Sequence, residues 1–191
     1  MSDTWSELPK VIILFSGKRK CGKDYLSEAL LKKLGPDRAQ IIRISEPIKR
    51  HWSEKMGLDL SELLSDSAYK EQYREKMIVW SDERRREDYG VFCRAACLSI
   101  NRDICIVSDV RRKTDVQFFR ETFGTERVRT VRIEASEAER SRRGWQFQQG
   151  VDDVQSECDL DDFVAWDMVL QNEETDTVDA SLEQLVMLAS R

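Results

Sequence analysis

The sequence predicts an α/β fold of three layers, in which helices cover both faces of a five-stranded parallel sheet. Short apolar stretches without polar alternation are typical of strands buried on both faces. They occupy residues 11–15, 41–44, 104–107, 128–133 and 168–170. Stretches with helical spacing separate them, and this alternation favours a parallel sheet. The length of 191 residues, with 40% hydrophobic, fits one domain with one core.

Helices are predicted after several of these strands. From Asp24 apolar residues recur at helical spacing, and Gly35-Pro36 ends the pattern. After the fourth strand, Ser136 and Glu139 have the spacing of a capping box, in which each side chain bonds a backbone N–H of the first turn. The last helix carries one apolar stripe, formed by Leu182, Leu185, Val186 and Ala189.

Two long stretches interrupt the alternation, and long loops of this kind usually serve a function. Residues 46–100 are mostly helical, and 144–166 combine two glycines with six acidic residues. We therefore expect one domain, 1–191. Its core is expected at 10–45, 101–143 and 167–191, with a helical substrate-binding insertion at 46–100 and a lid at 144–166.

Charge and cysteine usage narrow the function classes. The chain has 31 Lys and Arg against 36 Asp and Glu, a net charge of −5, so nucleic acid is not an expected partner. Its basic residues are nevertheless clustered, which suggests small anionic ligands. Five cysteines without a Cys-x-x-Cys pair argue against disulfides and a zinc ribbon, and Cys93 and Cys97 are expected in the core. His51, the only histidine, is expected at the surface.

The N-terminal residues do not have the pattern of a signal peptide for export. It is acidic and polar, and no apolar run approaches the roughly 18 residues of a membrane span. We therefore expect a cytosolic monomer that does not bind membranes.

Residues 17–23 match the pattern Gly-x4-Gly-Lys between a predicted strand and a predicted helix. In such a loop the backbone N–H groups surround phosphate oxygens, and the lysine, here Lys23, reaches the terminal phosphates. Gly17 and Gly22 permit close approach and unusual backbone angles, and the start of the next helix favours an anion. The pattern predicts a nucleotide site, the alternative being a basic turn between strand and helix.

Two carboxylates are candidates for a metal site. Asp24 stands where the general motif has a Ser or Thr that binds Mg²⁺, and a carboxylate binds Mg²⁺ directly or through water. A role at the helix start is the alternative. Asp109 follows the third strand at the carboxyl edge of the sheet, where ligands bind in open α/β folds. It is the candidate for the second Mg²⁺-orienting acid, with a charged loop as the alternative.

Arginines are grouped where phosphates are expected. Arg111 and Arg112 follow Asp109 after one intervening residue, within reach of the transferred phosphoryl or the acceptor phosphate. Arg140 and Arg143 precede Gly144-Trp145, and a basic segment flanked by glycines is typical of a lid, although a solvated helix end also explains it. In the insertion, Lys70 and Arg74 are four residues apart and share a helical face, which makes them a candidate clamp for the acceptor phosphate.

These elements resemble the nucleoside-monophosphate-kinase-like branch of P-loop proteins. From about residue 11 to the end the chain is similar, more narrowly, to the animal-type phosphomevalonate kinase family, whose loop also has Asp at the position of Asp24. The resemblance lies in Phe15-Ser16-Gly17-Lys18-Arg19-Lys20, Gly22-Lys23-Asp24, Val107-Ser108-Asp109, Arg111-Arg112, Arg143-Gly144-Trp145, Gly150-Val151-Asp152-Asp153 and Ser156-Glu157-Cys158.

The resemblance implies a three-layer P-loop kinase fold and ATP-dependent, Mg²⁺-requiring conversion of 5-phosphomevalonate to 5-diphosphomevalonate in isoprenoid and sterol synthesis. The catalytic residues that it implies are Lys18, Arg19, Lys23, Asp24 and Arg111. It implies ATP contacts from Gly17, Lys18, Arg19, Lys20, Cys21, Gly22, Lys23, Asp24, Arg140 and Arg143. It assigns the acceptor to Lys70, Arg74, Arg85, Arg111, Arg112 and Asn172. Arg132 matches a basic position near the lid.

The implied reaction needs no general base, because a phosphate acceptor is already anionic at neutral pH. Fixed positive charge would stabilise an in-line transfer. One rival is a nucleoside or deoxynucleoside monophosphate kinase, because spacing alone does not decode the acceptor. The other is a nucleotide-regulated switch, but the Asn-Lys-x-Asp and Asp-x-x-Gly segments of GTP switches are missing.

Overall fold

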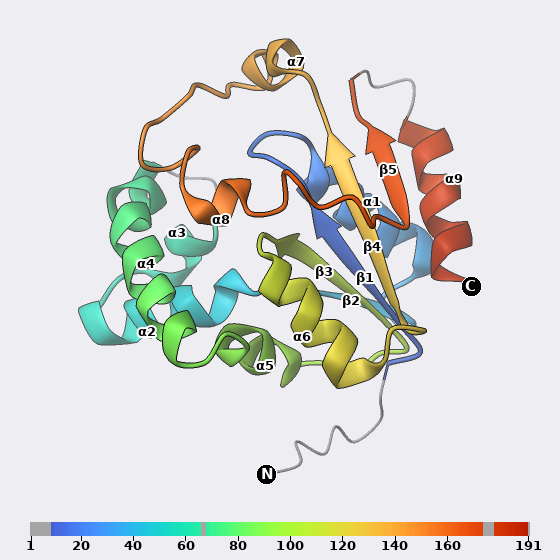
Figure 1. Cartoon of the computed structure of the whole chain (residues 1–191), viewed down its shortest axis with the longest axis horizontal. Coiled ribbons are helices and arrows are strands. Elements are labelled where there is room, and N and C mark those ends of the chain that lie inside the picture. Colours follow the sequence, from blue (N-terminus) through green and yellow to red (C-terminus); the bar gives the residue numbers. More distant parts are fainter. Residues whose placement is uncertain (1–8, 66–67, 174–177, 191) are drawn as a thin grey trace.

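The computed structural model describes residues 9–65, 68–173 and 178–190 (Figure 1). Five strands form one sheet in the order β2-β3-β1-β4-β5, and all neighbouring strands are parallel. The strands are β1 (Val11–Ser16), β2 (Ala39–Ile42), β3 (Ile104–Val110), β4 (Val128–Glu134) and β5 (Met168–Gln171). The predicted α/β fold with a five-stranded parallel sheet is confirmed.

Helices cover both faces of the sheet, as Figure 1 shows. The helices α1 (Lys23–Leu34) and α9 (Val178–Ala189) pack with Ile13 and Phe15 on one face. On the other face, α5 (Val91–Cys97) and α6 (Lys113–Phe123) pack with Ile12 and Leu14. All four of these β1 side chains are 0% exposed. Successive residues of a strand point to opposite faces, so a strand buried on both sides shows no polar alternation.

The predicted capping box at the start of α7 (Glu137–Arg142) forms only in part. The Ser136 hydroxyl accepts a hydrogen bond from the Glu139 backbone N–H at 3.2 Å, as predicted. The Glu139 carboxylate does not return the bond but pairs with Arg142 and Arg143. Glu173 takes its place and accepts from the Ser136 backbone N–H at 2.7 Å. The start of α7 is therefore held by the segment that follows β5.

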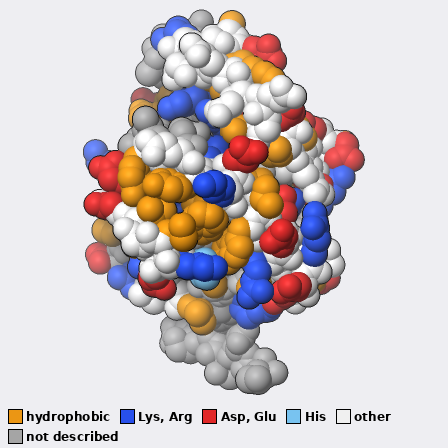
Figure 2. Space-filling model, turned by 90° about the vertical axis from the view of Figure 1, so that its left-hand side faces the viewer, with side chains coloured by type: hydrophobic (Ala, Val, Ile, Leu, Met, Phe, Trp, Pro, Cys, Tyr) orange, Lys and Arg blue, Asp and Glu red, His pale blue; other side chains and the backbone are white. Residues whose placement is uncertain are grey.

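The two long stretches contain further helices. Between β2 and α5 lie α2 (Ser45–Met56), α3 (Leu60–Leu64) and α4 (Ala68–Glu87), and α8 (Gln155–Cys158) lies in the stretch between β4 and β5. No residue of α2 is fully buried. Figure 2 shows exposed apolar side chains gathered on the face of these inserted helices. Weaker burial makes α2 easier to displace than the helices that cover the sheet.

Two single-residue expectations have different outcomes. Cys93 and Cys97 are buried in the core, as predicted, and burial raises the pKa of Cys97 to about 12, so that it stays a neutral thiol. His51 is only partly exposed, because one face of its ring stacks on Trp80 with 4.3 Å between the ring centroids. Within the described ranges, no helix is long and apolar enough to cross a membrane.

Candidate active site

The glycine-rich loop at 17–22 connects β1 to α1, where the local geometry requires glycine. A Cβ on Gly17 would lie 2.5 Å from both the Cys21 Sγ and the Ile133 carbonyl oxygen. Gly22 has φ +91°, in the left-handed region, and a Cβ there would lie 2.1 Å from the Asn172 Nδ2. Such distances leave no room for a side chain, so the loop conformation depends on both glycines.

Three side chains from other parts of the chain donate to carbonyl oxygens of the loop. Asn172 Nδ2 donates to the Cys21 oxygen at 2.8 Å, and Arg143 Nη1 donates to the same oxygen at 3.0 Å. Arg140 Nε donates to the Arg19 oxygen at 2.8 Å. These bonds, together with one inside the loop from the Cys21 N–H to the Lys18 carbonyl at 3.2 Å, fix the conformation of the loop. An anion site formed by the remaining N–H groups of the loop stays a prediction.

The loop opens onto a cavity of about 950 Å³. Inserted helices and the turn after β3 form the opposite wall, so the cavity joins the predicted nucleotide and acceptor regions. The predicted site residues that line it are Arg19, Lys20, Gly22, Lys23, Asp24, Arg74, Arg85, Asp109, Arg111, Arg112 and Arg143. A cavity of this size, lined by so many cations, suits ligands that carry several phosphates.

Some predicted residues lie behind the cavity wall or outside the described part. Among the described side chains, those of Lys18, Arg132, Arg140 and Asn172 are not part of the cavity lining. Arg140 and Asn172 instead hold the loop from behind. The side chain of Lys70 falls outside what the structure describes. Its role therefore stays a prediction.

Lys23 and Asp24 form the first turn of α1 and point into the cavity region. Lys23 is only 6% exposed, and its Nζ lies 3.8 Å from the Asp24 carboxylate. The N-cap residue of α1 is Gly22, and no side chain caps this helix start by a hydrogen bond. Asp24 is therefore not the capping residue. Its carboxylate, 66% exposed, is accessible from the cavity.

Asp109 is fixed by the backbone at the start of α2. Its two carboxylate oxygens accept from the Ile44 and Ser45 N–H groups at 2.7 and 2.9 Å. A carboxylate has about four lone-pair sites, so these bonds orient Asp109 and still leave acceptor capacity. Its assignment to the metal stays a prediction.

The turn after β3 is built around Asp115. Its Oδ2 accepts from the backbone N–H groups of Arg111 and Arg112 at 3.1 and 3.0 Å, and its Oδ1 accepts from Arg85 at 2.7 Å. Asp115 is completely buried, so these three bonds satisfy a charge that would otherwise be costly. One carboxylate thereby sets the positions of three arginines predicted for the acceptor.

The arginines of this turn differ in their charge balance. Burial lowers the pKa of Arg111, but Glu157 and Asp109 outweigh that effect, and the pKa is raised overall. Burial also lowers the pKa of Arg112, and its partner Asp82 does not fully offset the change. Arginine stays charged in either case, so both side chains remain cations at the cavity.

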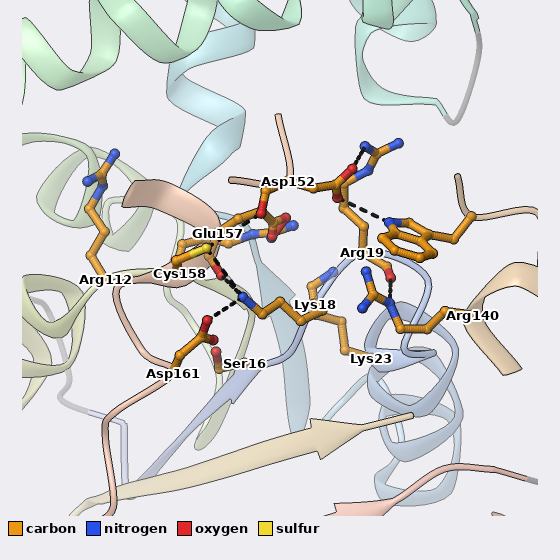
Figure 3. A network of polar contacts seen from close by, with 12 residues as sticks. Ser16, Lys18, Arg19, Lys23, Arg112, Arg140, Asp152, Glu157, Cys158 and Asp161 are labelled. Atoms are coloured by element: carbon orange, nitrogen blue, oxygen red, sulfur yellow. Dashed lines mark hydrogen bonds and ion pairs between the residues drawn. The ribbon is translucent and has the colours of Figure 1, made fainter. Parts of the chain in front are cut away.

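Carboxylates of the 144–166 stretch contact cations of the predicted phosphate site (Figure 3). Asp161 accepts from Lys18 at 2.6 Å, Asp152 accepts from Arg19 at 3.0 Å, and Glu157 pairs with Arg111. Lys18 also donates to the Glu157 carbonyl at 2.8 Å. Lys18 therefore joins the loop to this stretch, whereas a contact of its side chain with phosphates stays a prediction.

Sequence reasoning assigned no role to the carboxylates Asp115, Asp152, Glu157 and Asp161, which orient the cations. The sequence pointed in part to such ion pairs, because the 144–166 stretch carries six acidic residues and the loop at 17–23 is basic. Spacing alone does not say which acidic residue meets which cation, because these pairs are separated by 30 to 143 positions. The geometry of the folded chain makes that assignment.

A family model and a curated relative point to the same family. The family model described as phosphomevalonate kinase matches residues 15–125. A curated phosphomevalonate kinase from Drosophila melanogaster is 54% identical over 182 residues, covering 91% of this chain and 96% of the relative. Among solved structures, a shikimate kinase from Aquifex aeolicus matches with TM-score 0.53 and 13% identity, covering 93% and 95% of the two chains. A gluconokinase from Sinorhizobium meliloti matches with TM-score 0.50 and 16% identity, covering 96% of each chain. At these identities the two structures support the fold alone.

Proposed function

The chain belongs to the phosphomevalonate kinase family, and on this basis we propose that it transfers the γ-phosphoryl group of ATP to 5-phosphomevalonate, forming 5-diphosphomevalonate. It is thus a phosphotransferase with a phosphate group as acceptor. One observation carries the choice of acceptor, namely 54% identity that extends over 91% of the chain. The observed cavity, with the loop on one side and Arg85, Arg111 and Arg112 on the other, is compatible with two phosphorylated ligands.

In this proposal the loop binds the nucleotide phosphates through its backbone N–H groups, with Lys23 on the terminal phosphates. The acceptor phosphate lies near Arg85 and Arg112, whose guanidinium groups are held by Asp115 and Asp82 and line the cavity. An oxygen of the acceptor attacks the γ-phosphorus in line with the bond to the leaving oxygen. Arg19, Lys23 and Arg111 stabilise the charge that spreads over the transferred group. No residue has to remove a proton, because the attacking oxygen is anionic.

We also propose a Mg²⁺ requirement, which the residues at the loop can accommodate. Mg²⁺ is usually bound by one or two carboxylates together with substrate phosphates and water. Asp24 fits this role, because its carboxylate is exposed at the cavity beside Lys23. Asp109 has both oxygens in backbone hydrogen bonds and fits better as a second partner that acts through water. Bound Mg²⁺ would neutralise phosphate charge and hold the phosphates in one orientation.

The wider context follows from the same proposal. A kinase that makes 5-diphosphomevalonate acts in the mevalonate pathway, which supplies isoprenoid and sterol precursors, and the cytosol is the proposed location. The direct test incubates the purified protein with MgATP and 5-phosphomevalonate, follows ADP release in a coupled assay, and identifies the product by ³¹P NMR. A diphosphate product supports the proposal. ADP release without a new diphosphate resonance contradicts it.

A further inference from the structure

Four contacts link the side chain of Arg19 to its own backbone in a closed ring (Figure 3). Arg19 Nη1 donates to Asp152 Oδ2 at 3.0 Å, and Trp145 Nε1 donates to Asp152 Oδ1 at 3.1 Å. The guanidinium of Arg140 lies over the Trp145 ring, 3.9 Å from its centroid. Arg140 Nε then donates to the Arg19 carbonyl oxygen at 2.8 Å. Both ends of Arg19 are thus tied to the segment that follows β4.

Asp152 is the member of the ring on which the other contacts depend. Its side chain is only 5% exposed, and it accepts a third hydrogen bond from the Gln148 backbone N–H at 2.9 Å. A buried carboxylate is stable only when its oxygens are fully bonded, and Asp152 meets that condition with three donors. One of its oxygens thus pairs with the Arg19 guanidinium, and the other accepts from Trp145.

The bond to Asp152 leaves Arg19 able to act on a ligand. A guanidinium has five N–H donors in a rigid plane, and the contact with Asp152 uses one of the two terminal nitrogens. Arg19 also lines the cavity. By binding one edge of the Arg19 guanidinium plane, the Asp152 carboxylate therefore fixes the direction in which the other N–H donors point.

We propose that Asp152 is a positioning residue that aims Arg19 at the nucleotide phosphates. The proposal rests on the proposed function only in its use of Arg19 at phosphate. A positioned arginine loses less conformational freedom when it binds, and charge-assisted hydrogen bonds depend strongly on geometry. Without Asp152, Arg19 keeps its charge but loses its orientation, so MgATP is held less tightly.

The chain offers a matched control in the adjacent residue. Asp153 is exposed, and its carboxylate accepts from the Gly150 backbone N–H at 2.6 Å, which serves the local turn only. The variants Asp152→Asn and Asp153→Asn make the same chemical change one residue apart. At position 152 an asparagine presents one acceptor oxygen and an NH₂ group to three donors, so one donor loses its partner.

The test is a double-mutant cycle on the affinity for MgATP, measured by calorimetry without any acceptor. We expect Asp152→Asn to raise the Kd for MgATP about tenfold and Asp153→Asn to change it less than twofold. In an Arg19→Lys background the lysine cannot form the same oriented contact, so adding Asp152→Asn should change the Kd less than twofold. Because no acceptor is present, a failure of the 5-phosphomevalonate assay does not affect this result.

Two outcomes would overturn the proposal. One is an unchanged Kd in Asp152→Asn. The other is an equal loss of MgATP affinity when Asp152→Asn is added to the parent and to Arg19→Lys. Equal losses would mean that Asp152 acts independently of Arg19. Should Asp152→Asn fail to fold, Trp145→Phe removes the N–H donor to Asp152 and part of the aromatic surface under Arg140. That variant should raise the Kd for MgATP about threefold when residue 19 is Arg and leave it unchanged in Arg19→Lys. An unchanged Kd in both backgrounds would contradict the proposed role of the four contacts.

Discussion

The side-chain amide of Asn172 donates to the Cys21 carbonyl at 2.8 Å, so the end of β5 holds the phosphate-binding loop from behind. Asn172 is 6% exposed, and the same oxygen accepts from Arg143. The matched asparagine was expected to contact a ligand directly. In the structure its amide contacts the loop instead, and it would influence the nucleotide through the conformation of Gly22.

This packing predicts that Gly22→Ala abolishes nucleotide binding. Gly22 has φ +91°, and an added Cβ would meet the Asn172 amide at 2.1 Å. Gly35→Ala is the control, since Gly35 has φ +90° but nothing within 4 Å of the added Cβ. Both variants should lose about 1–3 kcal/mol of unfolding free energy from backbone strain. Only Gly22→Ala should lose MgATP binding by calorimetry, and normal binding by it would refute the account of the loop.

Lys23→Met should reduce kcat by roughly 10² or more. The Lys23 ammonium is expected to stabilise charge more strongly in the transition state than in bound ATP. Methionine has a similar length and suits the buried position, so the unfolding midpoint should stay close to that of the parent. Lys32→Met, on the exposed side of the same helix, is the control and should keep full activity. A kcat for Lys23→Met within a few-fold of the parent would disprove the role.

Asp24→Asn should lower kcat and shift the Mg²⁺ titration to higher concentration. The change keeps the shape of the side chain and removes the charge that would hold Mg²⁺ or its water shell. Asp24→Ser tests the alternative helix-start role. Because no side chain caps α1, serine should also lose activity, with little change in stability. An unchanged kcat and Mg²⁺ dependence in Asp24→Asn would assign the residue to structure only.

The 144–157 segment should gain protection from hydrogen exchange when MgATP and the acceptor bind together. Asp152 ties this segment to the loop through Arg19, and Glu157 ties it to the turn after β3 through Arg111. Phosphates at the same cations should tighten the closure. The turn at 35–38, which lies outside the cavity lining among the described residues, is the internal control. Equal hydrogen exchange of 144–157 in the free and ternary states would contradict the proposal that this segment is a lid.

Local patterns predicted the scaffold well for physical reasons. A strand such as β1 must be apolar throughout because both of its faces are covered, and the loop needs glycine where Gly17 and Gly22 leave no room for a Cβ. Both requirements are visible within a few residues of sequence. The expected position of Lys23 at the start of α1 follows from the same local rules.

The partners of the cations could not be predicted in this way. The pair Arg111 and Glu157 spans 46 positions, and its formation depends on how β3 and the 144–166 stretch meet in space. The stacking of His51 on Trp80 was likewise not predicted, because it depends on the packing of α2 against α4. Glu139 has the correct spacing for a capping box, yet nearby arginines compete successfully for its carboxylate.

The most direct test of the central claim measures kcat/KM for a panel of acceptors with MgATP at saturation. The panel contains 5-phosphomevalonate, mevalonate, and nucleoside and deoxynucleoside monophosphates. We expect 5-phosphomevalonate to be converted to its diphosphate, with kcat/KM at least about 10³-fold above every other acceptor, because the arginines of the cavity are fixed for one phosphate position. A higher kcat/KM for any nucleoside monophosphate would contradict the assignment of the acceptor.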